Sequence, residues 1–207
     1  MRTSSEIEVD WQHVMTIEPA GKAIISILID QAVEKNCLLL HINLTAHLRQ
    51  QHPLLKNLYK KDGLPESTQH NFRDKSSFII CCQGGIDLHY KEILINHFSQ
   101  RLDEDTLFSI QLVINELIQN AVDHSTSERY YIYFGILERH IHLGVLDMGV
   151  TLPSKMEQKY NADNDIDFLE MSLIKGITTR RMRVGGLGLY HTLEMIKDVG
   201  GKYSRDF

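Results

Sequence analysis

The sequence predicts an α+β protein made of two parts, and three observations lead to this fold class. Short apolar runs have the length of β-strands, and longer stretches carry apolar residues at steps of three and four, the period of a helix with one buried side. A polar segment rich in turn-forming residues, 65–75, separates two groups of such runs. We therefore expect a small α/β domain at 1–75 and a larger domain at 76–207.

The first domain is expected to contain a strand, a helix and a second strand in that order, which favours a parallel pair of strands. The second strand, CLLLHIN, is apolar without interruption, and this predicts that both of its faces are covered. No motif assigns a chemistry to this domain, so we interpret it as a regulatory or interaction domain. The expected elements are strands at 14–18 and 37–43, a helix at 22–36 and a further helical pattern at 45–63.

The second domain is expected to alternate strands and helices around an antiparallel hairpin. The hairpin is predicted because two strand-like runs are joined by only Glu138 and Arg139. The expected elements are strands at 77–83, 130–137 and 140–147, helices at 86–102, 105–125 and 189–199, and a polar loop at 150–184 with a helical piece at 166–175.

Composition excludes several classes of function. The net charge of -5 argues against a general nucleic-acid binder, because phosphate contacts need a basic surface. Cys37, Cys81 and Cys82 form an odd set without a CxxC pair, which favours a reducing compartment over disulfides or a zinc ribbon. The first residues lack the apolar run of a signal peptide, and no segment is long enough to span a bilayer. We expect a cytoplasmic protein that has no membrane partner.

The helix expected at 105–125 carries the first candidate site residues. Glu116 and Asn120 are four residues apart and therefore share a face at the edge of the apolar stripe, with Asp123 one turn further on. A carboxylate beside an amide can hold a water molecule and a cation. As an isolated pair, Glu116 and Asn120 could equally be ordinary solvated residues.

Two glycine motifs follow in the same domain. Asp147, Met148 and Gly149 end the second strand of the hairpin, and the run Gly185 to Gly188 opens the last helix. Amide N–H groups at a helix start favour anions. By itself, each motif could also be a simple turn or cap.

As an ordered set, NELIQNA at 115–121, DMG at 147–149 and GGLGL at 185–189 resemble the N, G1 and G2 boxes of the GHKL superfamily, the histidine-kinase-like ATPases. The resemblance spans residues 77–203 and is closest to the anti-sigma-factor serine kinases. It implies a Bergerat-type α/β sandwich, in which helices cover one face of a mixed, mostly antiparallel sheet. It also implies ATP and Mg²⁺ as cofactors.

The resemblance implies a role for each candidate residue. Asn120 would coordinate Mg²⁺, and Glu116 would position or deprotonate the attacking hydroxyl or water. Asp147 would accept the adenine amine, with Gly149 letting the purine approach the backbone. The remaining nucleotide-binding residues would be Asp123 beside Asn120, an arginine on the γ-phosphate, and glycine-box residues around the polyphosphate. The arginine would be Arg181, or its neighbours Arg180 or Arg183, and the glycine-box residues would be Gly185, Gly186, Leu187 and Gly188.

The sequence departs from the family pattern at two places. Val150 stands where the family commonly has another glycine, and the chain ends at KYSRDF, before the family's last strands. A partner, a longer chain or a second copy could supply those strands, so a homodimer through the sheet edge is an open expectation. The order of elements at 1–75 resembles the STAS-type antagonist domains that partner such kinases, in topology alone.

These observations lead to one expected function and two alternatives. We expect a Mg-ATP-binding regulatory protein in bacterial-type signalling, either a serine/threonine protein kinase or a slow ATPase that acts on a protein partner. The alternatives are a non-catalytic module that senses nucleotide and the ATP-binding half of a histidine kinase system. An EF-hand at 163–174 is excluded, because Phe168 stands at the required glycine and Ile174 at the required glutamate.

Overall fold

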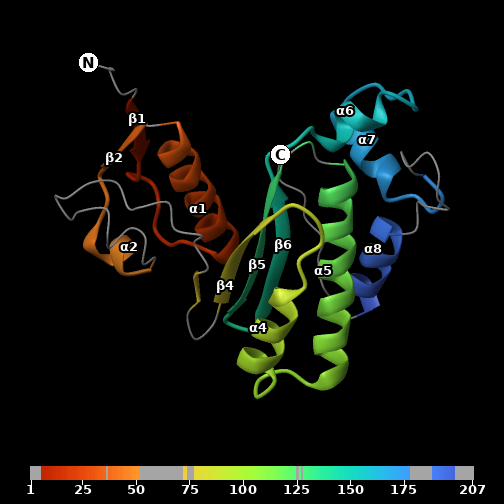
Figure 1. The fold of residues 1–207 in the computed structure, drawn as a ribbon, viewed down its shortest axis with the longest axis horizontal. Helices are drawn as coiled ribbons and strands as arrows, with labels where there is room; N and C mark the ends of the chain where they lie inside the picture. The colour runs from red at the N-terminus through yellow and green to blue at the C-terminus, as the bar shows by residue number, and fades with distance from the viewer. Residues whose placement is uncertain are drawn as a thin grey trace. The chain divides into compact units, whose positions relative to one another are not determined.

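The described residues form an α+β fold of seven helices and two sheets (Figure 1), so the fold class predicted from the sequence is confirmed. The structure is a computed structural model, and it describes residues 6–35, 37–51, 72–73, 77–124, 126, 128–177 and 188–198. The smaller sheet has the strand order β1-β2, and the larger has the order β3-β4-β5-β6. The elements are β1 (Glu6–Asp10), α1 (Pro19–Glu34), β2 (Leu38–Ile42), α2 (Ala46–Gln51), β3 (Phe72–Arg73), β4 (Ser77–Gln83), α4 (His89–Phe98), α5 (Glu104–His124), β5 (Arg129–Leu137), β6 (His140–Asp147), α6 (Leu152–Met156), α7 (Asp165–Ser172) and α8 (Gly188–Asp198).

The chain divides into two compact units. The first unit combines residues 1–81 with 131–144, and the second combines residues 82–130 with 145–207. The division therefore passes through strands β4, β5 and β6. The boundary at residue 75 that the sequence predicts stays a prediction.

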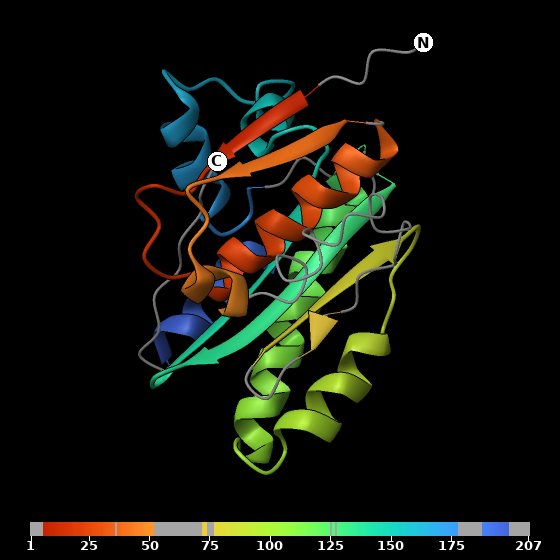
Figure 2. The same cartoon turned by 90° about the vertical axis from the view of Figure 1, so that its left-hand side faces the viewer.

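The first unit contains the predicted parallel pair of strands, but one strand lies elsewhere than predicted. β1 and β2 run parallel, and their arrows point the same way in Figure 2. The strand predicted at 14–18 is wrong, because the amide of Val14 donates to the carbonyl of Trp11 at 3.0 Å and closes a turn. The helix predicted at 22–36 is α1, and it begins at Pro19, whose fixed φ suits the first helical turn.

A small apolar core holds the first unit together. It lies between α1 and the inner face of the β1-β2 pair, where Val9 and Leu39 pack against it. The helical pattern predicted at 45–63 is described only as α2, and its later part lies outside the described residues. The core residues are Trp11, Ile17, Ile25, Ile29, Leu44 and Leu48.

The larger sheet contains the predicted hairpin. β5 and β6 are neighbouring strands joined by Glu138 and Arg139, and Glu138 takes the left-handed φ of 54° that such a tight turn requires. Beside the hairpin, the amide of Gly84 donates to the carbonyl of Glu128 at 2.9 Å, so the end of β4 lies at the start of β5. Strands β4 and β5 are therefore antiparallel.

Helix α1 packs against this sheet within the first unit. The hydroxyl of Tyr131 on β5 donates to Asp30 of α1 at 2.6 Å. Four residues along β5, Gly135 faces the start of α1, where a Cβ would come within 2.5 Å of the Pro19 ring. The absence of a side chain at Gly135 thus permits the close approach of helix and strand.

The second unit follows the sequence prediction closely in its helices. The helix predicted at 105–125 is α5, the helical piece predicted at 166–175 is α7, and α6 is a further short helix in the segment predicted as a polar loop at 150–184. Among the helices that the structure describes, none is both long enough and apolar enough to span a bilayer. The cytoplasmic location stays a prediction.

Candidate functional site

Helix α5 positions Glu116 and Asn120, and local sequence fixes where this helix begins. The side chain of Asp103 accepts hydrogen bonds from the amide and the hydroxyl of Thr106, at 2.7 and 2.8 Å. These bonds lower the pKa of Asp103, and its charge lies at the positive end of the helix. The buried stripe of α5 comprises Leu107, Ile110, Val113, Ile114, Ile118 and Ala121.

Tyr90 connects α5 to its neighbour α4. Its buried hydroxyl donates to the side-chain oxygen of Asn115 at 2.7 Å and to the carbonyl of Gln111 at 3.2 Å. Burial raises the pKa of Tyr90, so the hydroxyl remains a donor. Because Asn115 directly precedes Glu116, these bonds fix the rotation of α5 at the candidate site.

The carboxylate of Glu116 lies against Gly188, the first residue of α8. A Cβ placed on Gly188 would overlap Oε2 of Glu116, so glycine is the residue that leaves room for this contact. The contact brings together two motifs that are separated by 72 positions of sequence. The carboxylate also lies at a helix start, where the helix dipole favours negative charge.

Two buried polar atoms along α5 and α8 find no hydrogen-bond partner in the part of the chain that the structure describes. They are Nδ2 of Asn120 and Oγ1 of Thr192. Asn120 is one helical turn from Glu116, and Thr192, which is 1% exposed, is one turn from Gly188. Buried polar groups are almost always satisfied, so the unsatisfied Nδ2 of Asn120, one helical turn from Glu116, fits a site that takes a polar ligand.

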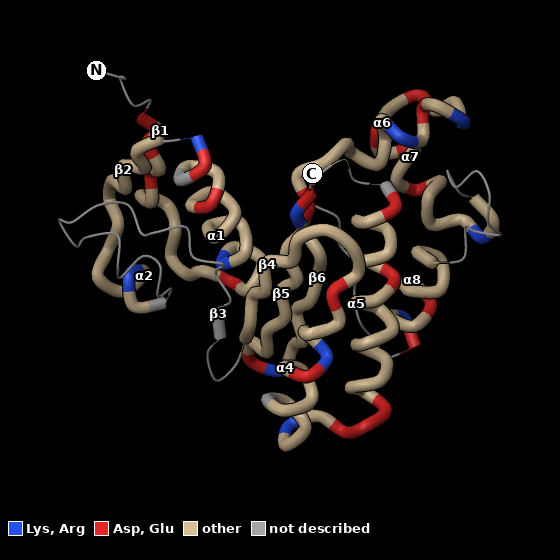
Figure 3. Tube along the Cα trace, viewed as in Figure 1, with Lys and Arg blue, Asp and Glu red and all other residues tan. Residues whose placement is uncertain are grey.

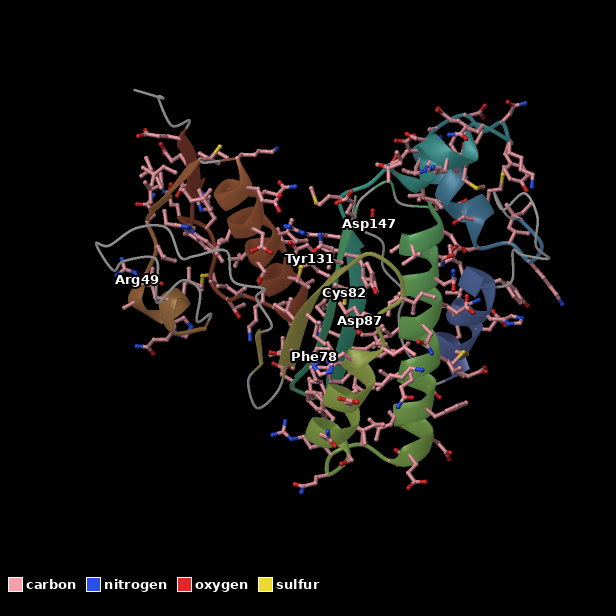
Figure 4. The ribbon with its side chains drawn as sticks, viewed as in Figure 1. Arg49, Phe78, Cys82, Asp87, Tyr131 and Asp147 are labelled. Carbon is pink, nitrogen blue, oxygen red and sulfur yellow. The ribbon has the colours of Figure 1, made fainter. Side chains whose placement is uncertain are left out.

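A cavity of about 340 Å³ lies at the end of α5 that follows Asn120. Asp147 contributes to its lining from the end of β6 (Figure 4). One oxygen of the Asp147 carboxylate accepts a hydrogen bond from the amide of Gly149 at 2.8 Å, which orients the side chain. The lining residues are Gln83, Gly84, Ala121, Val122, Glu128, Arg129, Tyr130 and Asp147.

Tyr130 stiffens one wall of this cavity. Its hydroxyl donates to the carbonyl of Gly85 at 3.1 Å and accepts from the amide of Asp87 at 2.9 Å. Burial raises the pKa of Tyr130, so the phenol keeps its proton and both bonds. Gln83, Gly84 and Tyr130 line the cavity, although the sequence does not predict them as site residues. Antiparallel pairing of 77–83 with 130–137 would have placed them side by side, but only the hairpin partner of 130–137 was predicted.

The structure groups some of the predicted site residues and separates others. Glu116 and Asn120 lie one turn apart on α5, and Glu116 approaches Gly188. Asp147 lines the cavity, and Gly149 donates its amide to Asp147. Asp123 lies on the exposed side of α5, where its carboxylate accepts from the side chain of Gln119 at 2.8 Å, and it does not line the cavity. The other predicted residues, Arg181, Gly185, Gly186 and Leu187, lie outside the described residues.

A clustered metal site is not present in the described ranges, where no three His, Cys, Asp or Glu side chains are arranged to hold an ion. Mg²⁺ held by the amide oxygen of Asn120 and by phosphates does not need such a cluster. Comparison with family models, curated proteins and solved structures gave no significant match. The resemblance to the GHKL superfamily therefore remains a hypothesis that rests on the residues themselves.

Proposed function

We propose that this chain is a Mg-ATP-binding regulatory protein of the GHKL type, and that it acts as a serine/threonine protein kinase or slow ATPase on a protein partner. The observation that carries the proposal is the close approach of Gly188 to Glu116. Two motifs that were linked only by their order in the sequence meet in space, at a helix start that favours anions.

The site would hold the nucleotide along α5. The cavity beside Asp147 is of a size that takes a small ring system, and we assign the adenine to it. Asn120 directly precedes Ala121 of the cavity lining, and its Nδ2, which finds no partner in the described residues, can donate to a phosphate oxygen, while we assign its Oδ1 to the metal. Glu116 lies one helical turn further from the cavity on α5, and its carboxylate approaches Gly188. When bound, Mg-ATP supplies the transferable phosphoryl group, with its charge neutralised by the metal.

Glu116 would then act on the nucleophile. Its carboxylate lies at the start of α8, next to the backbone that we assign to the phosphates. A carboxylate in hydrogen-bond reach of a hydroxyl or water can orient it and take its proton. This role differs from that of Asn120, which we assign to binding the phosphates and their metal. The two residues can therefore be tested separately.

Calorimetry of the full-length chain tests whether the site binds nucleotide. ATP and ADP are titrated with and without Mg²⁺. We expect saturable binding of ATP that becomes tighter when Mg²⁺ is present, because Asn120 supplies an oxygen ligand and the phosphates supply the others. Absence of any heat of binding from a folded chain would refute the proposal.

Replacement of Glu116 by glutamine separates catalysis from sensing. We expect Glu116→Gln to keep its affinity for Mg-ATP within a few-fold but to lower ATP turnover or partner phosphorylation by about 100-fold or more, the typical contribution of a general base. Turnover equal to that of the wild type would exclude the catalytic role and leave a nucleotide-sensing module.

A further inference from the structure

The outer face of β2 presents a row of exposed apolar side chains. The strand is apolar throughout, and its burial alternates from residue to residue. Leu39 packs inward against the core of the first unit. Leu38, Leu40 and Ile42 point to the opposite face, where they are 39%, 37% and 36% exposed. The apolar sequence of β2 thus predicts that other residues pack on both faces of the strand. Among the described residues, such packing is found on the inner face.

An acidic row runs beside this apolar row. In the parallel pair, Glu6 is the register partner of Leu38, and Glu8 is the partner of Leu40. Register partners point to the same face, so the exposed carboxylates of β1 flank the exposed leucines of β2. Figure 3 shows this contrast, with acidic segments in β1 and none in β2. We call this surface, made by Glu6, Glu8, Asp10, Leu38, Leu40 and Ile42, the outer face.

The composition of the outer face restricts what can cover it. Parallel strands are normally buried on both sides, and an exposed apolar row beside charged residues is typical of an interaction surface. The acidic row repels nucleic acid and anionic lipid. A second copy stacked leucine row on leucine row would leave both acidic rows without a cationic partner, so it complements the outer face less well than a basic partner does.

We propose that the outer face binds an amphipathic helix of a partner protein, in which a stripe of lysine or arginine flanks a stripe of apolar residues. The apolar stripe covers Leu38, Leu40 and Ile42. The basic stripe pairs with Glu6 and Glu8 across the parallel register. A helix completes the layer that the sheet lacks, as α1 does on the inner face. This interaction does not depend on ATP, so it extends the proposed function to a second surface.

Two designed peptides test this proposal with the full-length chain. Both form amphipathic helices with the same leucine stripe, and one carries lysines along its flank whereas the other carries glutamates. Fluorescence anisotropy of the labelled peptides is the measurement. We expect the lysine peptide to bind at least about tenfold more tightly and to weaken as salt rises. Equal binding of the two peptides, or binding of neither, overturns the proposal.

Substitutions on the outer face locate the interaction. Leu40→Lys should weaken binding of the lysine peptide by about tenfold or more, and the exposed double change Glu6→Lys with Glu8→Lys should reverse the preference toward the glutamate peptide. Fluorescence of Trp11, the single tryptophan of the chain and 6% exposed, verifies that the variants fold. Phe108→Lys changes a 62% exposed residue of α5 and is the matched control, which should bind normally.

Two further outcomes would contradict the proposal. If the folded Leu40→Lys and charge-reversed variants bind the lysine peptide as the wild type does, the peptide binds elsewhere. If the free chain is a dimer that Leu40→Lys separates into monomers, a second copy is the occupant of the outer face. Sedimentation velocity of wild type and variant distinguishes this case.

Discussion

At the scale of single residues, the Glu116 carboxylate can occupy its observed place only if residue 188 has no side chain. A Cβ on Gly188 would meet only the end of the Glu116 side chain, and the end of a side chain can move. The backbone of Gly188 itself has no left-handed φ. The fold therefore tolerates a methyl group at this position, but the carboxylate does not keep its place.

We expect Gly188→Ala to retain the stability of the wild type, or to gain up to about 1 kcal/mol from its helical position. It should lower turnover strongly, because the methyl group displaces the carboxylate of Glu116. Thermal unfolding and turnover are measured on the same sample. Gly85→Ala is the matched control, since a Cβ there meets nothing within 4 Å. Wild-type turnover in Gly188→Ala would show that the carboxylate position does not matter.

His41 supplies a second consequence at this scale. The indole of Trp11 donates to Nδ1 of His41 at 2.9 Å, so this nitrogen must be unprotonated. Burial lowers the pKa of His41 below its ordinary value of 6.5. At pH values between the lowered pKa of folded His41 and 6.5, the unfolded chain binds more protons than the folded chain. This contribution to stability is therefore present above about pH 6.5 and is lost as the pH falls through the lowered pKa.

Urea unfolding followed by Trp11 fluorescence should show a lower midpoint at about pH 5.5 than at about pH 7.5. His41→Gln keeps an acceptor for the indole but cannot be protonated, so it should show a smaller change in midpoint between the two values. An equal change in wild type and variant would assign the effect to other groups.

At the scale of elements, two consecutive tyrosines of strand β5 form hydrogen bonds to separate segments of the chain. Tyr130 and Tyr131 are consecutive and point to opposite faces of the sheet. The first bonds to the loop before α4, and the second bonds to α1. Burial also raises the pKa of Tyr131, whose hydroxyl approaches the carboxylate of Asp30. Each hydroxyl fixes a helix or loop that lies far away in the sequence.

The hydroxyl of Tyr90 links α4 to α5 in the same way, and its contribution to the free energy of unfolding can be measured. Tyr90→Phe removes one hydroxyl and keeps the ring, so Asn115 and Gln111 lose a buried donor. We expect a loss of about 1 kcal/mol in the free energy of unfolding, the usual contribution of such a bond. Chemical denaturation followed by circular dichroism measures it. A free energy of unfolding equal to that of the wild type would show that this bond does not stabilise the packing of α4 against α5.

The elements that could be predicted from the sequence have strong periodicity. The helix expected at 105–125 and the hairpin strand at 140–147 agree with α5 and β6 to within one residue. The wrong strand at 14–18 and the true strand β1 are both short runs that contain apolar residues, and pairing with β2 identifies β1 as the strand. Helix α1 begins three residues before its predicted start, with Pro19 in its first turn, and α6, with Pro153 in its first turn, lies in a segment whose polar composition predicts a loop.

At the scale of the whole molecule, the described candidate residues for nucleotide binding all belong to the second unit. Their motifs could be recognised from the sequence because each has a fixed spacing. The cavity could not, since it depends on how the ends of β4, β5 and β6 meet beside α5. The outer face of β1 and β2 belongs to the first unit, so partner binding and nucleotide binding are assigned to separate surfaces.

The affinity of Mg-ATP for wild type and Asp147→Ala tests the central claim most directly, because Asp147 is the residue that we assign to adenine. We predict about tenfold to hundredfold weaker binding of ATP to the variant, the value of a lost hydrogen bond to a charged group. Inorganic triphosphate should bind both proteins equally, and the exposed change Asp163→Ala should have no effect. Equal affinity of wild type and Asp147→Ala for ATP would contradict the account.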